Sequence, residues 1–253
     1  MILNHRSLGQ GPPVVVLHGL FGSLDNWISV GKQLAANYSV YLVDLRNHGN
    51  SFHGDEFTYT AMAGDISQLV NELKIDPISI IGHSMGGKVG MFYTVLNENF
   101  VKKLIVVDIA PRHYPVHHQR ILDGLSAIDV NTITSRSQAD DVLRSYVPDE
   151  GTRQFLLKNL KRNSSGSFEW KINLPVIRDQ IENVGESLPE SPAVQVSTLF
   201  IKGGGSDYIS GEDHQDIHHR FANVKIQTIP GAGHWVHAEA PRAFLKSVNE
   251  FLG

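Results

Sequence analysis

The stretch GHSMGG, at Gly82–Gly87, follows the apolar run ISII at Ile78–Ile81 and precedes a helical pattern at Lys88–Leu96. A strand that ends in Gly-x-Ser-x-Gly and turns at once into a helix holds its serine in a strained turn beyond the sheet edge. Glycine on either side lets the strand and the helix approach closely. The helix N-terminus also favours negative charge beside the serine. The stretch predicts a nucleophile elbow with Ser84 at its tip; an ordinary strand-to-helix loop is the alternative.

The composition describes an ordinary globular protein and excludes several classes of function. The chain has 253 residues, of which 41% are hydrophobic and 19% charged, so a sizeable core can form. A formal net charge of −4 gives no indication of nucleic acid or of an anionic membrane as partner. Since there is no cysteine, disulfides, thiolate catalysis and cysteine-bound metals are excluded. The first residues contain no apolar run of signal-peptide length, so we expect a cytoplasmic protein.

Short apolar runs alternate with helical patterns along most of the chain. Such runs, rich in β-branched residues and bounded by turn residues, are typical of parallel strands buried on both faces. The alternation predicts an α/β fold with a mostly parallel central sheet flanked by helices. The runs are Val14–Leu17, Val40–Val43, Ile78–Ile81, Leu104–Val107, Thr198–Ile201 and Ile226–Ile229, and the helical patterns are Trp27–Ala36, Thr60–Leu73, Lys88–Leu96 and Pro241–Leu252.

The alternation breaks in the middle of the chain. Between about residues 110 and 192 the apolar spacing is that of several helices, followed by the polar turn Asn163–Ser167. We expect an all-helical insertion that covers the carboxyl edge of the sheet. The predicted organisation is a core of residues 1–110 and 191–253 with a helical cap at 111–190.

A serine nucleophile needs a base, and His234 is the predicted one. It lies in the small-residue loop GAGHWV that follows the last predicted strand. Its late position fits the chain order serine, acid, histidine of hydrolases with this elbow. A purely structural histidine is the alternative interpretation.

Stabilisation of an oxyanion is predicted from the loop after the first apolar run. In HGLFGS, which begins at His18, the backbone amide of Leu20 is the expected first donor, with Phe21 as the fallback. The second expected donor is the amide of Met85, directly after the predicted nucleophile.

The chain resembles the α/β-hydrolase fold superfamily over essentially its whole length, and specifically the bacterial YbfF-type esterases. That resemblance implies a small cytoplasmic enzyme with a helical cap that cleaves acyl esters and thioesters. The stretches that carry it are His18–Trp27, Asp44–Ser51, Gly82–Gly87, Val107–Pro111 and Gly231–His237.

The acid that orients the base has more than one candidate. In most of the superfamily it follows the penultimate strand in a Gly-x-x-Asp turn, and the turn here reads GGGSDYI from Gly203. Counting from that first glycine selects Ser206, and counting from the next selects Asp207. Asp108, at the end of the preceding strand, also lies where a carboxylate reaches the histidine. The resemblance favours Asp108 as the acid, with Ser206 hydrogen-bonded nearby.

Other polar clusters receive structural interpretations. In the loop DLRNHGNS we expect Asp44 to pair with Arg46. The group His113, His117 and His118 and the group His214, His218 and His219 each contain an i,i+4 pair expected to share a helix face, but neither matches a zinc motif. Arg112, His113 and Arg120 are expected to be solvated, with contact to an anionic substrate group as the alternative.

These observations predict a serine esterase that needs no metal or organic cofactor. Phe21 and Trp235 are the expected apolar walls of the substrate pocket, although either fits a core position equally well. The expected partner is a small-molecule acyl ester or thioester. A lyase or C–C bond hydrolase with the same three residues is the main alternative, and a non-catalytic ligand-binding protein is a second.

Overall fold

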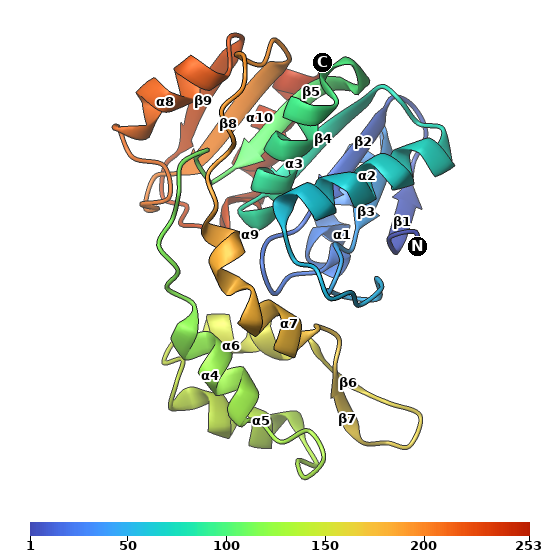
Figure 1. Ribbon diagram of the computed structural model, residues 1–253, viewed down its shortest axis with the longest axis vertical. Helices are drawn as coiled ribbons and strands as arrows, with labels where there is room; N and C mark the ends of the chain where they lie inside the picture. Colours follow the sequence, from blue (N-terminus) through green and yellow to red (C-terminus); the bar gives the residue numbers. More distant parts are fainter.

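The computed structural model describes residues 1–253, which form a seven-stranded sheet with helices on both faces (Figure 1). The strand order is β1-β3-β2-β4-β5-β8-β9. Every neighbouring pair is parallel except β1 and β3. The strands are β1 (His5–Leu8), β2 (Pro13–Leu17), β3 (Ser39–Val43), β4 (Ile78–His83), β5 (Val101–Val107), β8 (Ser197–Gly203) and β9 (Val224–Ile229).

The six strands predicted from apolar runs are all present, and β1 is an additional one. Its sequence, HRSL, contains no apolar run, and its residues are partly or fully exposed at the edge of the sheet. An edge strand has one protected side at most, so it needs no continuous apolar sequence. That is why the pattern that revealed the buried strands did not reveal β1.

Successive residues of the inner strands face two separate apolar layers. In β2, Val15 and Leu17 join the layer that contains α2 (Tyr59–Leu73) and α3 (Met85–Leu96), whereas Val14 and Val16 join the layer that contains α1 (Ile28–Leu34) and α10 (Pro241–Leu252). This alternation follows from the two-residue period of a strand. The remaining core helices are η1 (Leu24–Trp27), η2 (Glu98–Phe100), α8 (Asp213–Arg220) and α9 (Val236–Glu239).

Residues 111–190, here called the cap, leave the core after β5 and return before β8, and most of them lie below the sheet and its flanking helices in the view of Figure 1. The expectation that this insertion is all-helical is wrong, because it includes a two-stranded hairpin. The cap elements are α4 (Gln119–Ala127), α5 (Arg136–Arg144), α6 (Glu150–Leu157), β6 (Leu160–Arg162), β7 (Phe168–Trp170), α7 (Leu174–Asp179) and η3 (Ile181–Gly185).

The hairpin has a local cause in the turn Asn163–Ser167. The side-chain oxygen of Asn163 accepts the backbone amides of Ser165 at 3.1 Å and of Ser167 at 3.0 Å, which closes the chain into a turn. Directly opposite each other on the two strands, Lys161 and Glu169 form an ion pair of 3.0 Å.

The two segments that connect the cap to the core are bonded to each other and to α3. The amide of Leu188 donates to Pro111 O at 2.8 Å. The ammonium of Lys88 is fully buried and donates to the carbonyls of Pro111, Arg112 and Glu186 at 3.4, 2.6 and 2.5 Å. Burial lowers the pKa of Lys88 to about 7. The Lys88 side chain of α3 therefore joins both segments that connect the cap to the core.

None of the helices combines the length and the apolar character required to cross a bilayer.

Candidate active site

Ser84 lies in the turn between β4 and α3 with a strained backbone, φ 51° and ψ −118°. Its amide donates to Val107 O at 2.9 Å. A Cβ atom on Gly82 would lie 2.2 Å from the carbonyl oxygen of Gly86, and one on Gly86 would lie 2.5 Å from that of Leu17. Only glycine leaves room for this backbone contact, which is the physical reason for the spacing of the motif.

His234, in the loop between β9 and α9, contacts the carboxylate of Asp108 at the end of β5. Its Nδ1–H donates to Asp108 Oδ2 at 2.8 Å. The same carboxylate accepts the hydroxyl of Ser206 on Oδ2 and the amide of Gly203, at 2.9 Å, on Oδ1. Asp108 is fully buried, and these three hydrogen bonds replace its lost hydration.

Of the two aspartates considered as the acid, only Asp108 lies against the histidine. Asp207 is exposed, and its carboxylate takes part in no hydrogen bond. The structure therefore brings together Ser206, Asp108 and His234 but leaves Asp207 at the surface. Ser84 and His234 line one cavity, although no hydrogen bond joins their side chains. Contacts of this kind often shorten only when substrate is bound.

Two aromatic rings pack against the His234 imidazole. The Tyr208 ring is stacked on it, with a centroid distance of 3.9 Å and an interplanar angle of 19°. The His83 ring lies 4.7 Å away, and its Nε2–H donates to His234 O at 2.9 Å. Burial holds the pKa of His83 well below its ordinary value, so this ring is a neutral donor. Nothing in the sequence indicated a role for Tyr208 beyond its place two residues after Ser206.

The predicted oxyanion loop is held by two buried neutral histidines. His18 Nε2 accepts the amide of Leu45 at 3.0 Å, and its Nδ1–H donates to Gly19 O at 2.8 Å. His48 Nε2 accepts the amide of Phe21 at 3.2 Å. Burial lowers the pKa of His18 to about 4 and that of His48 to about 3, so both rings stay neutral at neutral pH.

These contacts separate the two candidate amides for the first oxyanion donor. The Phe21 amide is already engaged by His48, whereas the Leu20 amide has no acceptor within the chain. On its other side the loop is bonded to the cap, since the side-chain amide of Asn159 donates to Phe21 O at 2.7 Å. Asn159 and His48 are two contributors that sequence reasoning missed, because their partners lie far away along the chain.

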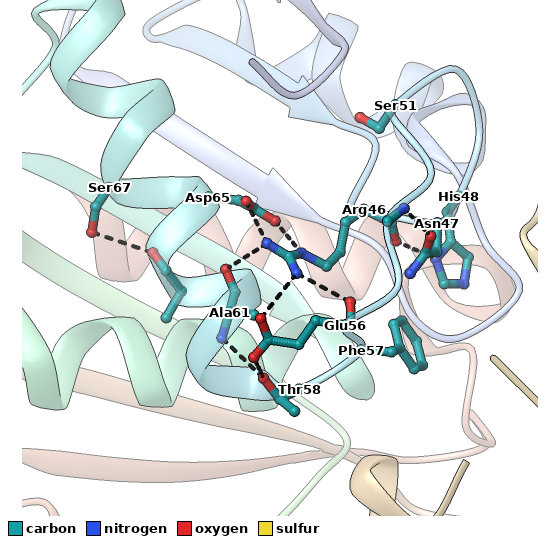
Figure 2. A network of polar contacts seen from close by, with 12 residues as sticks. Arg46, Asn47, His48, Ser51, Glu56, Phe57, Thr58, Ala61, Asp65 and Ser67 are labelled. Carbon is teal, nitrogen blue, oxygen red and sulfur yellow. Dashed lines mark hydrogen bonds and ion pairs between the residues drawn. The ribbon is translucent and has the colours of Figure 1, made fainter. Parts of the chain in front are cut away.

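The predicted pairing of Asp44 with Arg46 is wrong. The Arg46 guanidinium instead forms a bidentate ion pair with Asp65 of α2, at 2.5 and 2.8 Å, and donates to the carbonyl of Glu56 at 3.1 Å (Figure 2). Asp44 accepts the amides of Leu24 and Asn50 at 2.7 and 2.9 Å and the Asn4 side chain at 2.7 Å. Although Asp44 and Arg46 are only two residues apart, their side chains bond to different neighbours. Together these bonds hold the loop that carries His48.

A cavity of about 670 Å³ opens beside Ser84 and His234, between the core loops and the cap. Both predicted walls, Phe21 and Trp235, line it, and the ring of Trp235 lies 5.9 Å from that of Phe155 on α6. The remaining apolar lining residues are Leu20, Trp27, Ile121, Leu156 and Ala238.

The histidine and arginine groups follow the expectation only in part: His214 and His218 lie on α8 at the expected i,i+4 spacing. His113 and His117 lie in a non-helical connection before α4 and do not share a helix face. His117 and His118 line the cavity, and burial lowers the pKa of His118 to about 4. Arg112 is bound to Asp213 at 2.7 Å and lies over the Tyr114 ring at 3.9 Å, so it does not face the cavity. Arg120 is exposed and also lies outside it.

Similarity to known proteins extends over the whole chain. The family model described as alpha/beta hydrolase fold matches residues 12–241. The chain is 38% identical to Esterase YbfF of Escherichia coli K12 over 241 residues, which is 95% of this chain and 92% of the relative. It is also 38% identical to the sn-1-specific diacylglycerol lipase ABHD11 of Danio rerio over 253 residues, 96% of this chain and 79% of that one.

Among solved structures, one titled Marine microorganism esterase superposes with a TM-score of 0.97 at 40% identity, covering 99% of both chains. The resemblance stated from the sequence motifs and the predicted fold class are both confirmed by these similarities.

Proposed function

The chain belongs to the α/β-hydrolase fold family, and we propose that it is a serine esterase whose nucleophile, base and acid are Ser84, His234 and Asp108. It is a hydrolase of the esterase and lipase type, as its relatives are named. The observation that carries the proposal is the buried Asp108 carboxylate hydrogen-bonded to His234 in the cavity that also contains the strained Ser84.

In the proposed reaction, Ser84 Oγ attacks the acyl carbonyl while His234 Nε2 removes its proton. The Asp108 carboxylate holds the Nδ1–H tautomer and stabilises the imidazolium that forms. The imidazolium then protonates the leaving alcohol or thiol. Water activated by His234 hydrolyses the acyl-enzyme and releases the acid. Ser206, which donates to Asp108, helps to hold this buried carboxylate in place.

We assign the oxyanion donors to the backbone amides of Leu20 and Met85. The Leu20 amide is free of internal acceptors. Met85 begins α3, where the amides of the first turn have no intrahelical acceptor and the helix dipole favours negative charge. Such preorganised donors are each worth about 10²–10³ in turnover when removed singly.

The proposed substrates are esters and acyl thioesters with a small to medium acyl group. The cavity volume of about 670 Å³ and its walls of Phe21, Phe155 and Trp235 suit an apolar acyl chain. The bond that breaks joins the acyl carbon to oxygen or sulfur, and the same three residues serve both chemistries.

The test is steady-state hydrolysis of p-nitrophenyl esters of increasing acyl length. Asp108→Asn should lower kcat by about 10⁴, because the base loses its correct tautomer. Ser84→Ala should abolish turnover. Asp207→Asn is the matched control on a neighbouring loop and should stay close to wild type. A collapse of Asp207→Asn with Asp108→Asn retained would overturn the assignment of the acid.

Product analysis separates the esterase from a lyase or C–C bond hydrolase with the same residues. An esterase releases an alcohol or thiol together with an acid that carries ¹⁸O from labelled water. A lyase releases no labelled acid, and a C–C bond hydrolase releases a labelled acid with a carbon-protonated product in place of the alcohol or thiol. Wild-type enzyme that turns over neither esters nor thioesters would overturn the proposed function.

A further inference from the structure

Tyr208 is the residue in closest aromatic contact with the proposed base. Its ring is stacked on the His234 imidazole at 3.9 Å and 19°, and it lines the cavity that contains Ser84. We infer that Tyr208 is a positioning residue: its ring sets the plane of the imidazole, and its hydroxyl ties that plane to the first segment of the cap. The inference rests on the proposed function, in which His234 is the base.

A flat neighbour is needed because a single hydrogen bond does not orient a ring. The bond from His234 Nδ1 to Asp108, of 2.8 Å, fixes one atom of the imidazole, but a coupled change of the two side-chain torsions can still tilt the ring about that contact. The direction of Nε2 depends on this tilt, and no hydrogen bond between Nε2 and Ser84 restrains it. A ring stacked on the imidazole restricts its plane, so Nε2 remains aimed at Ser84.

The Tyr208 backbone is itself anchored next to the acid. Its amide donates to Ser206 Oγ at 3.3 Å, and that hydroxyl donates to Asp108. Its carbonyl accepts the hydroxyl of Tyr114, which accepts the amide of Ala110 at 2.8 Å. The main chain that presents the ring is thus fixed relative to the carboxylate that holds the base.

The Tyr208 hydroxyl reaches the cap. It lies 3.0 Å from His117 Nε2, and His117 Nδ1 lies 3.3 Å from the carbonyl of Pro115. With Nδ1–H donating to that carbonyl, Nε2 accepts a hydrogen bond from the tyrosine hydroxyl. Burial and the nearby Asp108 raise the pKa of Tyr208, which keeps the hydroxyl a donor at neutral pH. His117 belongs to the segment that leads into α4, so a shift of that segment moves the ring on the base.

The ring and the hydroxyl are tested by different variants. Tyr208→Leu removes the stacked ring and should lower kcat for p-nitrophenyl butyrate at least about tenfold, with KM changed less than about threefold, as expected when a reacting group is misaligned. Tyr208→Phe keeps the ring, so kcat should recover to within about fivefold of wild type. His117→Ala removes the same hydrogen bond from the other side and should match Tyr208→Phe, and the double variant should lose no more than either single one.

Nuclear magnetic resonance provides a readout that does not depend on turnover. With ¹³C-labelled histidine, the ring protons of His234, assigned by their loss in His234→Gln, should carry the ring-current shift of a stacked phenol in wild type and in Tyr208→Phe. The shift should disappear in Tyr208→Leu. If wild type cleaves no ester, the proposed function fails, while this measurement still decides whether Tyr208 holds the ring.

Three results would overturn the inference. The first is a Tyr208→Leu variant that is folded and keeps the wild-type kcat. The second is a rise in KM alone, which would make Tyr208 only a wall of the cavity. The third is an effect of Tyr208→Phe without a matching effect of His117→Ala, which would remove the link to the cap. Tyr208→Phe keeps the ring and removes only its hydroxyl, and His117→Ala removes an exposed side chain, so both variants should fold. They keep the inference testable even if Tyr208→Leu does not fold.

Discussion

The core and the cap differ in how their polar side chains at and around the cavity are held. On the core side, Asp108, His18, His48 and His83 are buried and hydrogen-bonded to other parts of the chain. On the cap side, the helices present apolar side chains, among them Ile121, Phe155 and Leu156, while the polar lining residues Asp149 and Lys158 are exposed.

The difference separates two tasks. Buried hydrogen bonds have fixed directions, so the core controls where the reacting groups point and therefore the rate of the chemical step. Apolar contacts have no preferred direction, so the apolar side chains of the cap, together with Phe21 and Trp235 of the core, control the volume and shape offered to the acyl chain. Substitutions in the core should change kcat, and substitutions in the cap should change KM.

The largest effect is expected where the backbone of the core leaves no space. A Cβ atom at Gly86 would lie 2.5 and 2.6 Å from the carbonyl oxygens of Leu17 and His18, so Gly86→Ala must displace the elbow. We expect kcat for p-nitrophenyl butyrate to fall at least about a hundredfold, because the nucleophile moves relative to the base. The matched control is Gly64→Ala on α2, where a Cβ meets nothing within 4 Å and kcat should be retained. Equal effects of the two variants would contradict the explanation.

Acid should destabilise the core through its neutral histidines. The pKa of His48 is about 3 in the folded protein, below its value of about 6.5 in the unfolded chain. Between these two pH values the unfolded chain binds more protons, so the free energy of unfolding falls as pH falls, by about 1.4 kcal/mol per pH unit for each such group. His18 and His237, with pKa values of about 4 and 3, act in the same direction.

Urea unfolding between pH 7 and pH 4 measures this slope. His48→Gln, whose side-chain oxygen can accept the Phe21 amide, should reduce the slope by about 1.4 kcal/mol per pH unit in the lower part of that range, where the unfolded imidazole is almost fully protonated. An unchanged slope in this variant would show that His48 is not held neutral.

One hydrogen bond from the cap tests how strictly the two tasks are divided. The buried Asn159 donates to Phe21 O at 2.7 Å and so supports the predicted oxyanion loop. We expect Asn159→Ala to destabilise the protein by about 1–3 kcal/mol and to lower kcat, since the carbonyl of Phe21 is left without its donor. A change in KM alone would mean that the oxyanion loop keeps its geometry without the cap.

The apolar wall of the cap should affect selectivity and leave the chemical step almost unchanged. Truncation of Phe155, which packs near Trp235, enlarges the cavity. Phe155→Ala should shift the optimum of kcat/KM toward longer p-nitrophenyl esters, with kcat on the best ester within about threefold of wild type. A large loss of kcat on every chain length would place Phe155 among the groups that act on the reaction itself.

The smallest effect is expected at the far end of the cap. Lys161 and Glu169 pair across the hairpin, and their side chains are 40% and 44% exposed. Because exposed ion pairs contribute little, Lys161→Met should change the free energy of unfolding by less than about 1 kcal/mol, measured by urea titration. A larger loss would show that the hairpin supports the cap more than its surface position suggests.

Sequence reasoning reached the parts of the molecule that depend on local patterns. The buried strands were found because two-sided burial demands continuous apolar runs, and the elbow was found because its glycines have fixed spacing. The edge strand β1 and the hairpin β6–β7 were missed because neither requires an apolar run. The pairing of Arg46 was missed because Asp65 and Asp44 are equally plausible partners until α2 is placed.

The sequence alone determined the fold class, the nucleophile turn and the position of His234, since each depends on neighbours within a few residues. Counting along the turn left Ser206 and Asp207 open as the acid, and the end of the preceding strand added Asp108. The tertiary structure shows which aspartate lies against the histidine, because parallel strands bring the end of β5 and the loop after β9 to the same edge, where Asp108 is buried against His234 and Asp207 is exposed. The same holds for Tyr208, His48 and Asn159. Their partners are distant along the chain, and only packing brings them into contact.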